Sequence, residues 1–304
     1  MADVRDPAPP RAIAHSEPLE AMGRLSGTAV GDVFVTRPSR RRRRGWRVAV
    51  LPPLALGAVV VGIWYLISYV VLDEGRRFLM PPPHDVVSVG FLEWDNLSLI
   101  LQALQRSATI ALIGLAISIV VGMTIAVLMS QTVVIERAVF PYMVMLQAIP
   151  ILAIVPLIGF WFGYGTNARV IVCVLISLFP IIVNTLFGLQ SAERGMHDLF
   201  TLQHASRLTR LRKLTFPAAL PAIFAGLRIS AGLSVIGAIV GDFFFGQGTP
   251  GLGQVLRRFA ANVRGEELFA TVITASMLGV AVFLAFGVLQ ARIIGKWHDP
   301  SGER

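Results

Sequence analysis

The sequence is poor in charge. Only 15% of its 304 residues are Asp, Glu, Lys or Arg, and 55% are hydrophobic, whereas an ordinary soluble domain has roughly 25% charged residues. Lysine occurs only at Lys213 and Lys296, and cysteine only at Cys173. This composition argues against a water-soluble globule, and the single cysteine excludes an intramolecular disulfide framework and a multi-cysteine metal site.

The motifs of common catalytic chemistry are also missing. Neither lysine is followed by Ser or Thr, so the chain has no Walker A loop with which to hold nucleotide phosphate. The sequence contains no His-Glu-x-x-His metal motif and no Gly-x-Ser-x-Gly nucleophile motif. We therefore expect no catalytic residues, no metal site and no cofactor bound by this chain, which disfavours a membrane-embedded enzyme.

Six long runs with almost no charge make up most of the chain. A bilayer core of about 30 Å needs roughly 20 apolar residues in a helix, and each run is long enough. Only the fifth carries a charge, Arg228. The sequence predicts an all-α, polytopic transmembrane bundle of about six spans, covering Val48–Leu72, Ser107–Ile135, Ala138–Ala168, Val170–Ala192, Phe216–Gly241 and Leu268–Ala291.

The placement of arginine predicts the orientation of these spans. Ten arginines lie within residues 1–47. With both termini cytoplasmic, nineteen Lys and Arg lie inside and seven outside, as the positive-inside rule requires. We interpret 1–47 as a disordered basic tail without a signal peptide, 48–297 as the membrane domain and 298–304 as a second cytoplasmic tail.

The run Arg40–Arg44 within the first tail admits two interpretations. It holds the N-terminus inside as a topology signal, or it binds anionic lipid or RNA. We favour the topology signal, because a basic membrane protein commonly uses its arginines for orientation. The charge of +9 therefore predicts no nucleic-acid partner.

Small residues recur at intervals of four in two of the runs. Without a hydrophobic driving force in lipid, helices associate by close backbone approach, which needs small side chains. Spans two and five are therefore expected to pack tightly inside the bundle. For each small residue taken singly, two interpretations remain open: it only packs helices, or it lies in or near a pathway. The stripes are Gly114, Ser118, Gly122 and Ala126, and Ala218, Ala222, Gly226, Ser230, Ser234 and Ala238.

Proline and glycine interrupt the third run. Broken helix inside a membrane is tolerated only where protein or a water-filled cavity satisfies the freed carbonyls, so a pathway lining and a kinked structural helix both remain open. The glycine-rich segment 241–253 suits an outer loop or gate. Arg228 has three interpretations: it attracts an anionic substrate, it has a buried structural partner, or its side chain extends to the membrane interface. The pathway and gate candidates are Gln147, Pro150, Pro156, Trp161, Phe162, Asn184, Arg228, Asp242 and Phe244.

The polar segment 193–215 lies between spans four and five. Its leucines are spaced as one face of a short helix or helix pair, and its other face is cationic. This pattern predicts a surface helix parallel to the membrane, which by itself indicates lipid contact, a partner groove or a linker.

This segment resembles the cytoplasmic loop of the membrane-spanning permease subunits of bacterial ABC importers. In that family the loop carries Glu-Ala-Ala, three residues, Gly, nine residues and Ile-x-Leu-Pro; here Asp198-Leu199-Phe200, His204 and Leu214-Thr215-Phe216-Pro217 stand at those positions. His204 replaces a glycine that permits a tight turn. The resemblance covers roughly 48–297 and is closest to the nitrate/sulfonate/taurine branch, through 146–150, 153–157, 161–165, 179–185 and 251–253.

The resemblance implies a non-catalytic permease subunit of an ABC importer in the bacterial plasma membrane. Its implied partners are a second permease copy, two cytoplasmic ATP-binding subunits that hold ATP and Mg, and an extracytoplasmic substrate-binding protein. Leu199 and Phe200 would fill a groove of the ATPase, with polar contacts at its rim. The implied coupling residues are Asp198, Leu199, Phe200, His204, Ala205, Ser206, Arg207 and Arg210.

The solute implied by this branch is either an anion similar to sulfonate, taurine or nitrate, or a heterocycle of the vitamin-precursor type. The alternative function is a self-sufficient secondary carrier or channel. We disfavour it because the span interiors lack the acidic residues that ion coupling usually needs.

Overall fold

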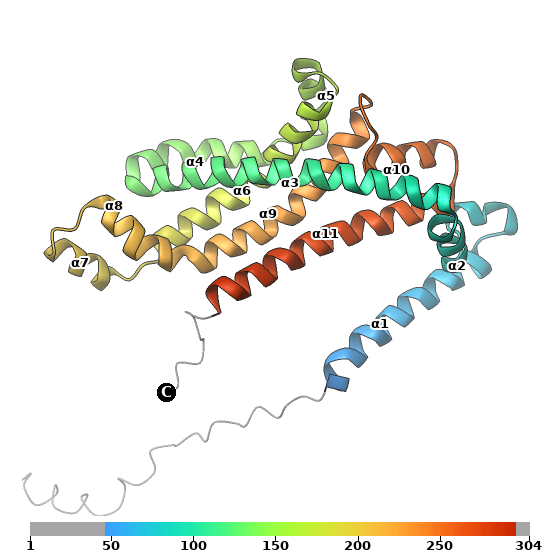
Figure 1. Ribbon diagram of the computed structural model, residues 1–304, viewed down its shortest axis with the longest axis horizontal. Helices are drawn as coiled ribbons and strands as arrows, with labels where there is room; N and C mark the ends of the chain where they lie inside the picture. Colours follow the sequence, from blue (N-terminus) through green and yellow to red (C-terminus); the bar gives the residue numbers. More distant parts are fainter. Residues whose placement is uncertain (1–45, 296–304) are drawn as a thin grey trace, which may run out of the picture. The chain divides into compact units, whose positions relative to one another are not determined.

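The computed structural model describes residues 46–295, and all of its regular structure is helical (Figure 1). The chain divides into two units after Ala58, and the bundle described here belongs to the second. The terminal tails expected at 1–47 and 298–304 lie almost entirely outside the described residues.

Short helices separate the first long helix from the rest. After α1 (Trp46–Leu66) come η2 (Ile67–Val71), η3 (Glu74–Leu79), α2 (Pro83–Val87) and η4 (Ser88–Leu92). The later elements are α3 (Trp94–Gln131), α4 (Val133–Ala148), α5 (Ile151–Phe162), α6 (Thr166–Gln190), α7 (Arg194–Leu202), α8 (Arg207–Arg210), η5 (Leu211–Thr215), α9 (Phe216–Phe244), α10 (Leu252–Ala261) and α11 (Gly265–Ile294).

The predicted number of spans is confirmed. In the described part of the chain five helices are long and apolar enough to cross a membrane, and α4 with α5 makes a sixth if this pair, bent by 97°, is one span. The bend falls at Ile149 and Pro150, inside the third predicted span, where Ile149 has the extended backbone that a residue before proline favours. The second span was predicted too short, since α3 begins at Trp94 rather than at Ser107.

Helices α6 and α9 form the centre of the bundle. Helix α6 packs along α9 on one side and α3 on another, and α11 packs against α9 (Figure 1). The largest apolar cluster joins Leu115 of α3, Ile181 of α6 and Ile223 of α9. The predicted tight packing of spans two and five is therefore confirmed, with α6 as the helix that both contact most.

Close backbone approach explains the small residues on α9. A Cβ atom at Gly237 would lie 2.7 Å from the Cα atom of Cys173, and one at Gly226 would lie 2.9 Å from the carbonyl oxygen of Pro180. Real Cβ atoms do not come so close to backbone, so glycine is required where α9 crosses α6.

Serine side chains add hydrogen bonds to this packing. The Ser118 and Ser177 hydroxyl oxygens lie 2.8 Å apart, and the Ser230 hydroxyl donates to the Ser177 carbonyl oxygen at 2.7 Å. All three serines are fully buried. Helices α3, α6 and α9 are thus joined at one level by hydrogen bonds as well as by van der Waals contact.

We predict that Gly237→Ala lowers the stability of the bundle by about 1–3 kcal/mol, because the added methyl group overpacks the α6–α9 contact. The matched control is Gly232→Ala on the same helix, where a Cβ atom meets nothing within 4 Å. Thermal unfolding of the two variants in detergent measures the difference, and equal midpoints would contradict the packing argument.

Candidate functional site

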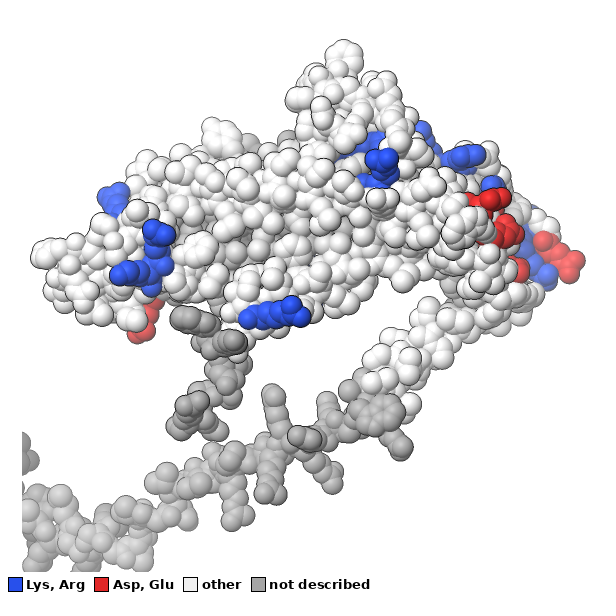
Figure 2. Space-filling view, in the orientation of Figure 1, with Lys and Arg blue, Asp and Glu red and all other residues white. Residues whose placement is uncertain are grey.

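The loop that carries α7 and α8 connects the C-terminal end of α6 to the start of α9. Lys and Arg gather around it with some acidic residues beside them, and the opposite end of the bundle also carries residues of both signs (Figure 2). The predicted helix pair is confirmed, with α7 at Arg194–Leu202 and α8 at Arg207–Arg210.

His204 forms the turn between these two helices. Its φ of 50° lies in the left-handed region that favours glycine. The N–H groups of His204 and Ala205 donate to the carbonyl oxygens of Thr201 and Phe200, both at 3.0 Å, which is the Schellman arrangement at a helix C-terminus. The backbone turn of a glycine is therefore kept although the residue is histidine.

Side-chain hydrogen bonds hold α8 against α7. The Ser206 hydroxyl oxygen accepts from the backbone N–H of Thr209 at 3.2 Å and so caps α8. Arg210 Nη2 donates to Thr201 Oγ1 on α7 at 2.9 Å. The two short helices therefore form one folded piece.

The outward face of α7 is apolar. Met196, Leu199 and Leu202 lie three residues apart and are exposed by 47%, 46% and 78%, which places them along one side of the helix. Phe200 is half-buried and Asp198 is exposed. Of the two predicted groove-filling residues, Leu199 is thus open to a partner and Phe200 is partly covered.

A polar cavity of about 460 Å³ lies on the inner side of the loop. Arg207 and Arg210, two of the predicted coupling residues, line it together with the ends of α3 and α6. Its full lining is Ser130, Gln131, Leu189, Gln190, His197, Arg207, Arg210, Leu211 and Thr215.

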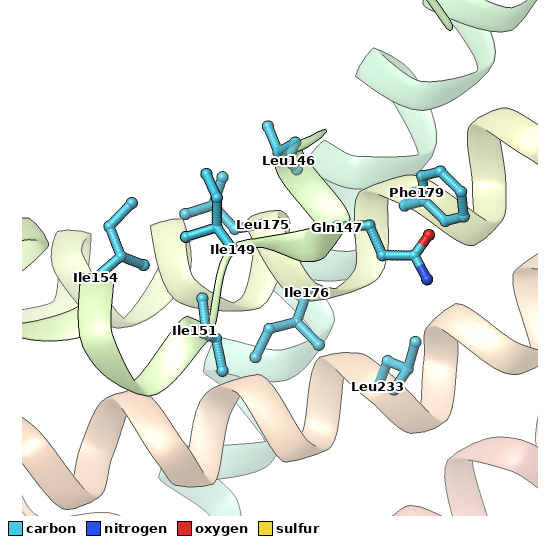
Figure 3. Close-up of a pocket in the computed structure, with 9 residues that line it drawn as sticks. All are labelled: Leu146, Gln147, Ile149, Ile151, Ile154, Leu175, Ile176, Phe179 and Leu233. Carbon is cyan, nitrogen blue, oxygen red and sulfur yellow. The ribbon is translucent and has the colours of Figure 1, made fainter. Parts of the chain in front are cut away.

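A second cavity, of about 360 Å³, lies at the break between α4 and α5. Gln147 is its one polar lining residue, and its amide points toward the side where Phe179 and Leu233 lie (Figure 3). The other lining residues are Leu146, Ile149, Ile151, Ile154, Leu175 and Ile176. Pro150, which caps the N-terminus of α5, makes the bend that opens this space.

Other predicted pathway residues lie elsewhere. Trp161 and Phe162 are exposed at the end of α5, and Pro156 is exposed on the same helix. Asn184 Nδ2 donates to the carbonyl oxygen of Pro180 at 2.8 Å, and its Cβ atom lies against Gly226. Asn184 therefore belongs to the α6–α9 contact and not to the cavity at Gln147.

Arg228 points to α11. Its Cζ atom lies 3.9 Å from the centroid of the Phe283 ring, a cation–π contact. Among the described residues Arg228 forms no ion pair, and its Nε atom is buried without a hydrogen-bond partner. The structure thus supplies an aromatic contact and no acidic partner.

Asp242 forms a buried ion pair with Arg169 at the opposite end of the bundle. Arg169 Nη1 lies 2.8 Å from Asp242 Oδ1, and the two side chains are 2% and 0% exposed. Arg169 also donates to the carbonyl oxygens of Phe245, Gln247 and Thr249. One guanidinium therefore joins the start of α6 to the loop that follows α9.

The same carboxylate caps α10. Asp242 accepts from the N–H groups of Gly251 at 3.2 Å and Gln254 at 2.8 Å, and Ser107 Oγ accepts from Leu252 at 2.9 Å. These groups are among the free donors at the start of a helix. The predicted outer segment 241–253 thus comprises the last turn of α9, where Phe244 is exposed, a loop held by Arg169 and Asp242, and the start of α10.

The sequence alone did not predict a structural role for Arg169, which is simply one of the outer arginines in the predicted orientation. The available signal was that Arg169 and Asp242 are the charges at the adjoining ends of spans four and five. That the two residues form an ion pair becomes evident only when the structure places α6 beside α9.

Comparison with known proteins connects these features to transport. Residues 114–301 match the model of the family described as "binding-protein-dependent transport system inner membrane component". The chain is 35% identical to a formylaminopyrimidine transport permease protein of Halalkalibacterium halodurans, over 82% of this chain and 96% of that protein.

Two further relatives are more distant. A putative aliphatic sulfonates transport permease protein of Bacillus subtilis is 25% identical over 92% of this chain and 97% of its own length. A taurine transport system permease protein of Escherichia coli is 25% identical over 86% and 95%, respectively. The similarity extends over nearly the whole length of all three relatives.

We predict that His204→Gly slows amide hydrogen exchange at Ala205 by about fivefold, because glycine removes a left-handed backbone cost of about 1 kcal/mol. Gln203→Gly is the matched control: the φ of Gln203 is −82°, so glycine there only adds freedom and should speed exchange. Exchange measured by mass spectrometry distinguishes the variants, and faster exchange in both would show that the turn is not strained.

Proposed function

The chain belongs to the family of binding-protein-dependent transport inner membrane components and is a permease subunit of an ABC importer; we propose that its α7–α8 loop is the point where a separate ATPase acts on it. The observation that carries this proposal is the apolar face of α7, with Met196, Leu199 and Leu202 exposed on a folded loop at one end of the bundle. Exposed apolar residues on a rigid helix suit insertion into a partner's groove.

The geometry of the loop supports its use as a lever. The Schellman turn at His204 and the bond from Arg210 to Thr201 join α7 to α8, and α8 continues through η5 into α9. A displacement of α7 is therefore transmitted to α9 without bending an intervening flexible linker. In this proposal ATP binding by the partner moves α7, and α9 and the closely packed α6 move with it.

The solute pathway in this proposal includes the cavity at the α4–α5 break. Broken helix at membrane depth belongs where it lines a cavity, and Gln147 supplies one amide there. The cavity has no charged lining residue. This supports an uncharged heterocycle, as in the formylaminopyrimidine relative, over an anion, as in the aliphatic sulfonates relative.

The partners in this proposal are a second copy of the chain, two ATP-binding subunits that hold ATP and Mg, and an extracytoplasmic binding protein. The chain itself is proposed to be non-catalytic. The proposed orientation places α7 and α8 in the cytoplasm with both termini. The excess of Lys and Arg on that side comes from the ten arginines of residues 1–47.

We predict that Leu199→Asp removes the ATPase from the purified complex, because a buried aspartate without a partner would have to enter an apolar groove. The loss should exceed tenfold, since burying an uncompensated charge costs more than about 1.4 kcal/mol. Co-purification from gently solubilised membranes, quantified by mass spectrometry, provides the measurement.

The matched control is Gln203→Asp. It adds the same charge to the same loop at an exposed position that contributes no apolar surface. Wild type and this control should retain the ATPase equally. Retention by Leu199→Asp would show that α7 does not fill a groove, and loss in both variants would show that any added negative charge on the loop is enough.

A further inference from the structure

The cavity beneath the α7–α8 loop lies where two long apolar helices end. Helix α3 ends with Ser130 and Gln131, and α6 ends with Gln190, directly after apolar residues such as Met129 and Leu189. In a membrane-spanning bundle, this change from apolar to polar side chains marks the boundary between hydrocarbon and headgroups. The cavity therefore opens at the level where lipid phosphates lie.

The charged side chains that line this cavity are cationic. Arg207 and Arg210 both reach it, with His197 beside them, and no Asp or Glu is among the lining residues. In the described part of the chain, neither arginine forms an ion pair. Glu136 lies nearby on α4, where it accepts from Gln190 Nε2 at 2.8 Å.

Most guanidinium N–H groups of these two arginines have no hydrogen-bond partner among the described residues. Arg207 makes no side-chain hydrogen bond to another described residue, and Arg210 makes one, to Thr201. The Arg210 Nε atom is buried without a partner. A guanidinium has five N–H groups in a planar fork, so most donors of the two arginines remain free.

Negative groups lie around these two arginines. The C-termini of α3 and α6 each contribute about half a negative charge, and the Glu136 carboxylate accepts from the lining residue Gln190. In the described part of the chain Glu136 forms no ion pair with either arginine. The free guanidinium N–H groups, and not a net charge, therefore indicate a site for an anion.

We propose that this cavity binds a phosphate group, held by Arg207 and Arg210. The guanidinium fork matches the oxygens of a phosphate in a two-bond arrangement. Ser130, Gln131 and Thr215 offer further polar groups, and Leu189 and Leu211 provide an apolar wall that suits the glycerol and chain of an anionic phospholipid. A bound phosphate would tie the loop to the ends of α3 and α6, so it would set how readily α7 moves.

The test uses the full-length chain in a neutral detergent. Dioleoylphosphatidylglycerol and dioleoylphosphatidylcholine are added separately, and the bound lipid is counted by native mass spectrometry. Arg207→Gln with Arg210→Gln should weaken phosphatidylglycerol binding by about tenfold or more, because two charge-assisted hydrogen-bonding groups are lost. Phosphatidylcholine should bind more weakly to the wild type, since its headgroup carries no net charge.

The matched control is Arg212→Gln with Lys213→Gln. It removes the same two charges from the next turn of the same segment, where both side chains are exposed and neither lines the cavity. This control should bind phosphatidylglycerol within about twofold of wild type. Equal weakening in the two double variants would overturn the proposal, because binding would then follow the charge of the loop and not the cavity.

Two single variants separate binding from loop structure. Arg207→Gln breaks no hydrogen bond within the described structure, so it should weaken lipid binding without disturbing the loop. Thr201→Ala breaks the bond to Arg210 but leaves the cavity's charge, so it should bind lipid normally. The reverse pattern would show that the arginines serve only to hold the loop, and would overturn the proposal.

Sodium phosphate, compared with sodium chloride at equal ionic strength, distinguishes the source of the phosphate. Thermal stabilisation by phosphate that Arg207→Gln abolishes would indicate a soluble phosphate as ligand, and Arg207-dependent binding of the lipid alone would indicate a headgroup.

If the arginine variants lose the ATPase but retain the lipid, the arginines are docking contacts and the proposal is wrong. Lipid loss with the ATPase retained supports the cavity site independently of the loop's proposed coupling role.

Discussion

The close approach of the α6 and α9 backbones is the constraint on which the rest of the structure depends. Glycine at 226 and 237 lets α9 lie against α6 at distances that no other residue allows. Because lipid does not drive helices together, this contact and the serine hydrogen bonds that join α6 to α3 and to α9 must supply the association. The positions of both candidate regions follow, since the α7–α8 loop joins one end of this pair and the Arg169–Asp242 ion pair joins the other.

The buried ion pair joins the two helices at the end far from the α7–α8 loop. Arg169 at the start of α6 neutralises Asp242 near the end of α9 and binds three carbonyl oxygens of the loop beyond it. Breaking such a pair by removing one partner is costly, because the other charge is left buried. In the proposed mechanism, a movement of the α7–α8 loop reaches the loop after α9 through a unit that is fixed at both ends, while the bent α4–α5 segment packs less closely against this unit.

Much of the fold could be predicted from the sequence because membrane spans need long apolar runs. A break in the third run was expected from its prolines, but the sequence does not distinguish Pro150, where the chain bends, from Pro141 and Pro156, which lie inside α4 and α5. The small-residue stripes predicted close packing of spans two and five, but not that α6 lies between them, because a stripe does not identify its partner helix. His204 was recognised from its spacing as the residue at a glycine turn, and its φ of 50° agrees. Arg169–Asp242 and the cationic cavity could not be predicted, since both depend on residues brought together by tertiary packing.

Whether α6 and α9 move as one body can be tested by distances between spin labels. With the single Cys173 replaced by Ala, labels at the exposed positions Phe187 on α6 and Ile229 on α9 report on the pair, and labels at Leu157 on α5 and Ile236 on α9 report on the pathway. Double electron–electron resonance is then measured on the ATPase complex with and without ATP, with labelled chain diluted in unlabelled chain. The α6–α9 distance should stay unchanged and the α5–α9 distance should change; a shift between α6 and α9 would show that the two helices do not move as one body.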